Sequence, residues 1–205
     1  MRRVAIVDYG MSNLDSVARA VEECGGTPSI ASRPKDLPGA DLIILPGVGA
    51  FPDGIRNLRQ RAFAEALHER VIERGAPFLG ICLGMQLLAA RGLEGEPIDG
   101  LGWIEGDVRR LTPGDSRERV PHVGWNEVIP SRDSRLLRGI PLDADFYFVH
   151  SYHLDCGNQA DVVARTPYAG SFVSVVERPP VYGVQFHPEK SQKLGFAVLK
   201  NFLTL

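Results

Sequence analysis

Cysteines are scarce in this sequence, and they lie far apart. Only Cys24, Cys82 and Cys156 occur in 205 residues. An odd number without C-x-x-C spacing argues against a disulfide framework and against a paired-cysteine metal or redox site. Because thiols stay reduced in the cytoplasm, we expect a cytoplasmic protein.

Long apolar runs and an excess of one charge are also missing. The first apolar run ends at Asp8, so it is too short for the core of a secretion signal. The longest run, residues 78–90, is shorter than a membrane span and contains Gln86. The formal net charge of −2 argues against charge-driven binding of nucleic acid. With 44% hydrophobic and 23% charged residues, the composition is typical of a globular domain with neither membrane nor nucleic acid as partner.

Strand-like and helix-like segments alternate through the first 90 residues. This order predicts an α/β fold with a parallel sheet and helices on both of its faces. One helix is expected to begin near Asn13, with Ser12 or Asn13 as its N-cap. The short apolar runs predict strands at 3–8, 28–31, 41–49 and 76–81, with helices at about 13–24, 52–74 and 85–91.

The second half of the chain is mostly strand-like. Six segments between residues 103 and 187 alternate with turn residues, and they predict an antiparallel extension of the same sheet. A final helix is expected near 191–203, with Ser191 as its cap. No linker interrupts the pattern, so residues 1–205 are predicted to form a single domain.

A cysteine between two glycines marks the end of the fourth predicted strand. The stretch LGICLGMQ places Gly80 and Gly84 two residues to either side of Cys82. Small residues at these positions are typical of a strained strand-to-helix turn that exposes a nucleophile over the end of a strand. The backbone N–H of Leu83 can then stabilise an oxyanion. The alternative is a buried structural cysteine, since cysteine is among the most buried residue types.

A base for this nucleophile is found near the end of the chain. The stretch GVQFHPEKS places Glu189 two residues after His187, with Pro188 between them. A cysteine nucleophile needs a base and a group that orients the base, and these two residues suit the two roles. A strand-end histidine that bonds only to backbone is the alternative.

A glycine-rich loop ends the third predicted strand. In LPGVG, Gly47 and Gly49 flank Val48, so backbone N–H groups can approach a substrate oxygen. The peptide between the glycines can rotate at low steric cost, which predicts one state with the Val48 N–H toward the site and one with it turned away. A plain turn is the alternative.

Together, the stretches GICLGMQ, LPGVGAF and GVQFHPEKS resemble those of class I, triad-type glutamine amidotransferases, from Val4 to about Lys200. The resemblance implies one flavodoxin-like amidotransferase domain, with a mostly parallel central sheet, helices on both faces and an antiparallel extension. It implies that the Cys82 thiolate attacks glutamine, that His187 transfers the proton and that Glu189 orients His187. Leu83 and the loop of Gly47, Val48 and Gly49 would hold the oxyanion, and Gln86 would contact the substrate. No cofactor and no metal is implied.

Two further stretches narrow the resemblance. Residues 8–14 and 120–128, with 146–152, are similar to those of glutaminase subunits of imidazole glycerol phosphate synthases, although Ser12 stands where such subunits usually have glycine. This implies a heterodimer with a (β/α)8-barrel cyclase subunit, which uses the ammonia to form imidazole glycerol phosphate and AICAR in histidine biosynthesis. The candidate contacts with that partner are Tyr9, Asn13, Trp125, Tyr147 and Lys190. A core position is the alternative for Trp125.

Two other functions remain open at this point. A paralogous amidotransferase subunit that supplies ammonia to another synthase would have nearly the same sequence. A stand-alone cysteine hydrolase on the same scaffold would work without a partner. A zinc site of His150, His153 and Cys156 is disfavoured, because both histidines fall on one predicted strand with two residues between them and so face opposite sides.

Overall fold

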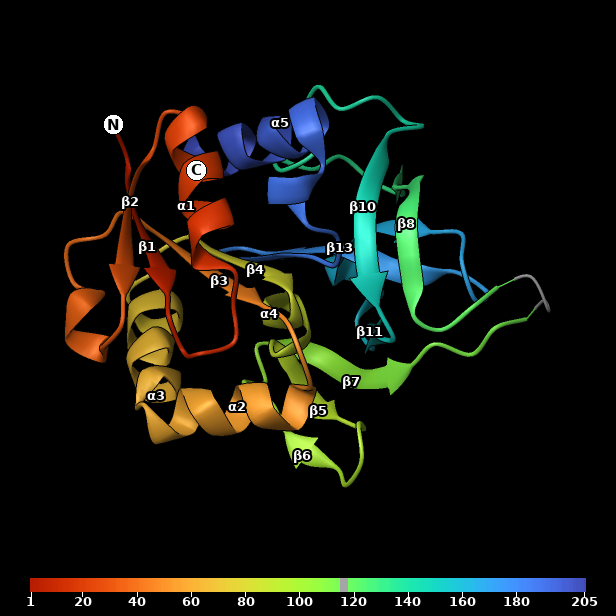
Figure 1. The fold of residues 1–205 in the computed structure, drawn as a ribbon, viewed down its shortest axis with the longest axis horizontal. Coiled ribbons are helices and arrows are strands. Elements are labelled where there is room, and N and C mark those ends of the chain that lie inside the picture. The colour runs from red at the N-terminus through yellow and green to blue at the C-terminus, as the bar shows by residue number, and fades with distance from the viewer. Residues whose placement is uncertain (115–117) are drawn as a thin grey trace.

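The main feature of the fold is an eight-stranded sheet (Figure 1), seen in a computed structural model that describes residues 1–114 and 118–205. Five neighbouring strands are parallel and the other three continue the sheet in antiparallel fashion. This confirms the predicted fold class. In spatial order the strands are β2 (Thr27–Ala31), β1 (Arg3–Val7), β3 (Leu42–Gly47), β4 (Phe78–Cys82), β14 (Val181–Val184), β13 (Phe172–Arg178), β12 (Val162–Thr166) and β9 (Ile129–Pro130).

Helices cover both faces of this sheet, as Figure 1 shows. The helices α1 (Leu14–Glu23) and α5 (Gln192–Leu203) pack on one face, and α2 (Phe51–Gln60) and α3 (Phe63–His68) on the other. Alternate residues of β1 belong to the two resulting cores, because successive side chains of a strand point to opposite faces. Burial on both faces explains why the central strands β3, β4 and β14 are apolar without a polar alternation.

The predicted helix over residues 52–74 is broken into pieces. Between α2 and α3, Ala62 adopts a left-handed conformation with φ of 56°. The chain changes direction at this break, and both Phe63 and Leu67 of α3 are buried in the core. A π-helical turn, η2 (Glu69–Glu73), follows α3 directly and ends before Gly75, as the sequence predicted for the whole segment.

The predicted helix over residues 85–91 is wrong. A single helical turn, α4 (Leu83–Gln86), is followed by a strand, β5 (Ala89–Gly92). The apolar run there has no polar face that would separate a helix from a buried strand, so pairing with a neighbouring strand decides the outcome. The second sheet contains, in order, β11 (Tyr152–Cys156), β7 (Ile104–Arg110), β5 and β6 (Ile98–Asp99).

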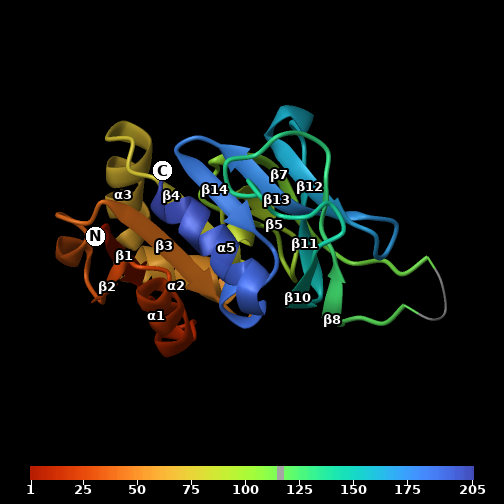
Figure 2. The same ribbon diagram turned by 90° about the horizontal axis from the view of Figure 1, so that it is seen from above.

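Only part of the second half extends the main sheet. A third sheet pairs β10 (Asp145–His150) with β8 (His122–Glu127), and both views place it away from β1 and β2 (Figure 1 and Figure 2). The single strand predicted around residues 145–154 therefore breaks at Ser151, and its two parts belong to different sheets. This break matters for function because it lies beside the site described below.

Asn13 and Ser191 occupy the N-cap positions predicted for them, but neither side chain bonds to its helix. Asn13 occupies the N-cap of α1 without a side-chain hydrogen bond, and the Ser12 hydroxyl is buried without a partner in the described part of the chain. Ser191 precedes α5, but its hydroxyl donates to the carbonyl of His187 (2.7 Å) and accepts from the N–H of Tyr147 (3.0 Å). Ser191 thus ties β10 to the segment that carries His187.

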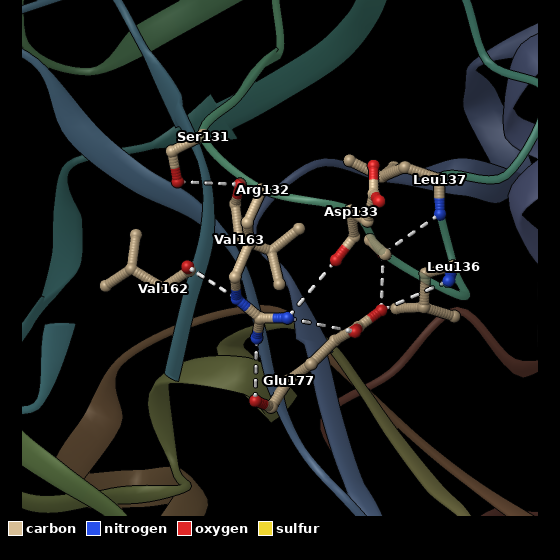
Figure 3. A network of polar contacts seen from close by, with 9 residues as sticks. Ser131, Arg132, Asp133, Leu136, Leu137, Val162, Val163 and Glu177 are labelled. Carbon is tan, nitrogen blue, oxygen red and sulfur yellow. Dashed lines mark hydrogen bonds and ion pairs between the residues drawn. The ribbon is translucent and has the colours of Figure 1, made fainter. Parts of the chain in front are cut away.

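A network around Glu177 fixes the chain that leads from β9 to β10 (Figure 3). This buried carboxylate accepts hydrogen bonds from the Ser134 hydroxyl and from the N–H of Leu136. One guanidinium nitrogen of Arg132 lies 3.7 Å from Glu177, and others donate to the carbonyls of Val162 and Glu177, both at 3.1 Å. The buried carboxylate is therefore held by several partners, as a buried charge requires, and the exposed guanidinium links three segments of the chain.

Within residues 1–114 and 118–205, no helix combines the length and the apolar character needed to cross a membrane.

Candidate active site

The candidate site lies where the parallel strands end. Because their carboxyl ends meet at one edge of the sheet, the loops after β3, β4 and β14 lie together. Gly47 of β3 pairs with Cys82 of β4, and Val184 of β14 pairs with Ile81. One residue further along, Gln185 lies beside Cys82. The register therefore brings together three stretches that are far apart in the sequence.

Cys82 has the predicted elbow conformation. Its φ of 53° is unusual for a residue with a side chain, and it occurs at the junction of β4 and α4. A Cβ on Gly84 would collide with the carbonyl of Leu45, and one on Gly80 would collide with the backbone of Gly84. The two glycines are needed because the turn is too tightly packed for any side chain.

His187 and Glu189 are paired as predicted. The Nδ1 atom of His187 lies 2.7 Å from Oε1 of Glu189, and both side chains are 3% exposed. His187 is extended, while Glu189 belongs to a short 3₁₀ turn, η4 (Pro188–Lys190). The N–H of His187 also donates to the carbonyl of Tyr147 at 2.9 Å. The pair is thus held from the backbone as well as through its side chains.

The other ring nitrogen of His187 is not engaged by Glu189. Nε2 is buried and has no hydrogen-bond partner among the described residues. The Cys82 sulfur is near enough to act electrostatically, although the pair falls short of a geometric hydrogen bond. Burial alone lowers the pKa of His187, but its contacts with Cys82 and Glu189 outweigh burial and raise the pKa above its ordinary value. The imidazole is therefore suited to hold a proton taken from the thiol.

A cavity of about 250 Å³ opens beside the sulfur of Cys82. Its lining includes Val48, Gly49, Leu83 and Gln86, four of the five residues proposed to bind the substrate or the oxyanion. Gly47, the fifth, does not line it. Sequence reasoning missed the wall opposite the elbow, which comes from the break between β10 and β11. A larger hollow, of about 630 Å³, lies beside Arg132 and Glu177 and holds none of these residues. The lining of the smaller cavity comprises Val48, Gly49, Cys82, Leu83, Gln86, Glu94, Val149, His150, Ser151 and Tyr152.

The glycine-rich loop is in the turned-away state. The N–H of Val48 donates to the carbonyl of Met11 at 2.8 Å, so it is not directed at the site. The Val48 side chain is 42% exposed, in contrast to the buried elbow. Glu94 supports the next helix, because its carboxylate accepts from the N–H of Phe51 at 2.8 Å. The position of the loop is consistent with the predicted rotation, and the second state stays a prediction.

Gln86 lines the cavity, but its amide nitrogen is already engaged. It donates to the carbonyl of Tyr152 (2.8 Å) and to Oε1 of Gln185 (3.0 Å). The amide nitrogen of Gln185 in turn lies 3.6 Å from the sulfur of Cys82. Sequence reasoning missed Gln185. Its signal was an amide side chain in an otherwise apolar run that leads into the histidine.

His150 belongs to a chain of neutral side chains. Its Nδ1 lies 2.8 Å from the carbonyl of Tyr152, and its Nε2 lies 3.1 Å from Nδ1 of His122. Burial lowers the pKa of His150 to about 3 and that of His122 to about 4. The described residues contain no group of three potential metal ligands, and His153 bonds instead to the carbonyl of Leu154.

Four of the five candidate contact residues lie at the surface. Trp125 is 48% exposed, which removes the core alternative, and its ring meets that of Tyr147 edge-on at 6.1 Å. The ammonium of Lys190 lies 5.9 Å from the centre of the Tyr147 ring. Asn13 is exposed. Tyr9, however, is fully buried, so its side chain cannot face a partner.

Comparison with known sequences points to one family. The model of the family "Glutamine amidotransferase class-I" matches residues 5–205. A protein of Campylobacter jejuni (strain RM1221) named imidazole glycerol phosphate synthase subunit HisH 1 is 45% identical, over 98% of this chain and 100% of its own length. The HisH subunit of Moorella thermoacetica is 46% identical, over 98% of this chain and 94% of its own.

Solved structures show the same fold at low identity. PurLQS from Thermotoga maritima superposes with a TM-score of 0.77 at 23% identity, over 100% of this chain and 99% of that chain. A structure described as a glutamine amidotransferase gives 0.73 at 18% identity, over 96% and 98%. Since the family model covers nearly the whole chain, this protein belongs to the class-I glutamine amidotransferases.

Proposed function

We propose that this chain is the glutaminase subunit of an imidazole glycerol phosphate synthase. The observation that carries the proposal is similarity at about 45% identity, over nearly the full chain, to proteins named as HisH subunits of that synthase. The proposal treats residues 1–205 as one amidotransferase domain. A cytoplasmic location belongs to it, and the three free thiols are consistent with this.

In this proposal, Cys82, His187 and Glu189 carry out the hydrolysis. The thiolate of Cys82 attacks the side-chain amide carbon of glutamine, and His187 takes the thiol proton through Nε2. The same proton then goes to the departing ammonia, which leaves a glutamyl thioester on Cys82. Water attacks that thioester and releases glutamate. Glu189 holds the imidazole in one orientation through the 2.7 Å contact at Nδ1.

The oxyanion would be stabilised by backbone donors. The N–H of Leu83, which begins the turn after Cys82, is one candidate. The N–H of Val48 is the second, after the peptide rotates away from the carbonyl of Met11. A glutaminase that holds this donor out of place would hydrolyse little glutamine until its partner is bound.

The proposed partner is a (β/α)8-barrel cyclase subunit, which receives the ammonia in a heterodimer. The exposed Trp125 and Lys190 both contact the half-buried Tyr147 ring, and the exposed Asn13 is the N-cap residue of α1. The backbone of Tyr147 bonds both to His187 and to Ser191. A partner docked on this cluster would therefore touch the strand that braces the base.

The test is glutamine hydrolysis by Cys82→Ala in complex with the cognate cyclase subunit and its acceptor ligand. We expect hydrolysis to fall by about 10³-fold or more while binding to the cyclase is unchanged. Cys156→Ala, which removes another buried thiol, is the matched control and should retain the rate. Hydrolysis by Cys82→Ala near the wild-type rate would overturn the proposed mechanism. If the wild-type chain hydrolyses glutamine equally fast with and without the cyclase subunit, a stand-alone hydrolase would be favoured.

A further inference from the structure

We propose that Gln185 is a further catalytic residue, whose side-chain amide donates a hydrogen bond to the sulfur of Cys82 and stabilises it as the thiolate. Gln86 is the positioning residue that fixes the direction of this donor. The inference rests on the proposed function, because it assigns the stabilised sulfur to the attack on glutamine.

The place of Gln185 in the fold is fixed by the sheet. Its side chain is fully buried, directly after the end of β14 and beside Cys82 of β4. Its backbone N–H donates to the carbonyl of Ser174 on β13 at 2.9 Å. The amide nitrogen Nε2 then lies 3.6 Å from the sulfur, a normal separation for a hydrogen bond to sulfur. A buried amide without such a partner would be unfavourable, so this contact also explains why the residue is tolerated there.

The direction of the amide follows from its neighbours. The carbonyl of Tyr152 can only accept, so the atom of Gln86 that lies 2.8 Å from it must be the NH₂ group. The same nitrogen lies 3.0 Å from the Gln185 side chain, which must present its oxygen there. The remaining end of the Gln185 amide is its NH₂ group, and it faces Cys82. A backbone carbonyl thus sets the orientation of two side chains in turn.

This donor distinguishes the two forms of Cys82. The neutral thiol can direct its own proton to the carbonyl of Val149, which lies 4.0 Å from the sulfur. Once His187 has taken that proton, the sulfur carries a negative charge and becomes a much better acceptor. Gln185 therefore stabilises the deprotonated sulfur more than the protonated one. His187 takes the proton, whereas Gln185 stabilises the charge that remains on the sulfur, so the two residues have separate roles.

Reactivity of the sulfur provides a test that does not depend on glutamine turnover. Alkylation of the full chain by iodoacetamide is measured across pH, with the Cys82 peptide followed by mass spectrometry. Gln185→Met keeps the side-chain length and removes the donor. We expect the midpoint of the pH profile to move upward by about one unit, the size expected when one hydrogen bond to a charged group is lost. In the complex, kcat at neutral pH should fall by about tenfold with little change in KM.

Gln86→Met tests the positioning role. We expect a smaller upward shift of the same midpoint, because Gln185 can then turn its oxygen toward the sulfur. The double variant Gln86→Met/Gln185→Met should shift no further than Gln185→Met alone. Ser174→Ala is the matched control, since its hydroxyl is buried on the neighbouring strand without a partner among the described residues, and its profile should be unchanged.

An unchanged alkylation profile in folded Gln185→Met would overturn the inference, whatever happens to glutamine turnover. If that variant fails to fold, Gln185→Glu replaces it, and its carboxylate should move the midpoint upward by more than one unit. An unchanged midpoint in Gln185→Glu would again overturn the inference. If wild type does not hydrolyse glutamine in the complex, the proposed function fails, yet the alkylation profiles still decide the role of Gln185.

Discussion

The elbow at Cys82 and the loop at Val48 end adjacent strands, but they differ in how firmly they are held. The elbow is buried, its glycines are locked by packing, and His187 and Glu189 already form their contact beside it. The loop is exposed at Val48, and its N–H is bonded to Met11 outside the site. The proposed base is therefore already oriented by Glu189 in the free chain, whereas the Val48 N–H, a proposed oxyanion donor, is bonded elsewhere.

This difference shows how activity can be controlled without moving the triad. The side chains of Cys82, His187 and Glu189, the proposed triad, are buried, so displacing one would disturb the packing around it. The loop needs only a rotation of one peptide, and Gly49, with φ of 103°, lets the chain turn there. A missing oxyanion donor typically costs about 10²- to 10³-fold in turnover, which is enough to separate an idle enzyme from an active one.

Val48→Pro changes the loop and leaves the elbow intact, and we expect it to have the largest effect on glutamine hydrolysis. Proline has no N–H, so the oxyanion donor is lost in both orientations of the peptide. We expect the rate of glutamine hydrolysis in the complex to fall by about 10²- to 10³-fold, while iodoacetamide still alkylates Cys82 at the wild-type rate. Val48→Ala keeps the N–H and is the matched control, with a rate near that of wild type.

Two results would contradict the role proposed for the loop. Full turnover by Val48→Pro would show that this N–H takes no part in the reaction. Slow alkylation of Cys82 in the same variant would show that the elbow and the loop are not independent.

Trp125→Ala should weaken binding of the partner without changing the elbow or the loop, and we expect a smaller effect than that of Val48→Pro. A large aromatic in an exposed cluster is a typical binding hot spot, so we expect binding to the cyclase to weaken by about 2 kcal/mol. That corresponds to about 30-fold in Kd, measured by calorimetric titration. At saturating partner the stimulated rate should return. Ile129→Ala removes a similarly exposed apolar side chain from β9 and should leave Kd unchanged.

Equal affinity of Trp125→Ala and wild type would place the docking surface elsewhere. If Trp125→Ala hydrolyses glutamine slowly even at saturating cyclase, Trp125 acts on the loop and not only on binding.

The tight turn at Cys82 and the pairing of His187 with Glu189 could be predicted from sequence, because their signals lie within short stretches. Glycines two residues either side of Cys82, and a glutamate two residues after His187, are each visible in one short stretch, although the carbonyl of Leu45 is what excludes a side chain at Gly84. The mostly parallel sheet could also be predicted, since each buried strand is a short apolar run. The sequence signals for these features therefore lie within short stretches of the chain.

Features that depend on distant partners could not be predicted in the same way. Residues 85–91 are mostly apolar, which allows either a helix or a strand, and pairing with β7 makes Ala89–Gly92 a strand. Ser191 is a good cap by type, but the carbonyl of His187 and the N–H of Tyr147 engage its hydroxyl. The burial of Tyr9 and the contact of Gln185 with Cys82 likewise arise only from the packing of strands far apart in sequence.

The most direct test of the account is the rate of glutamine hydrolysis by the free chain, compared with the chain saturated by the cyclase subunit and its acceptor ligand. The account predicts that kcat rises by about 10²-fold or more in the complete complex, because the Val48 N–H enters the site. The alkylation rate of Cys82 in the absence of glutamine should be the same in both states, since the triad is already assembled. A free chain that hydrolyses glutamine as fast as the complete complex would contradict the account.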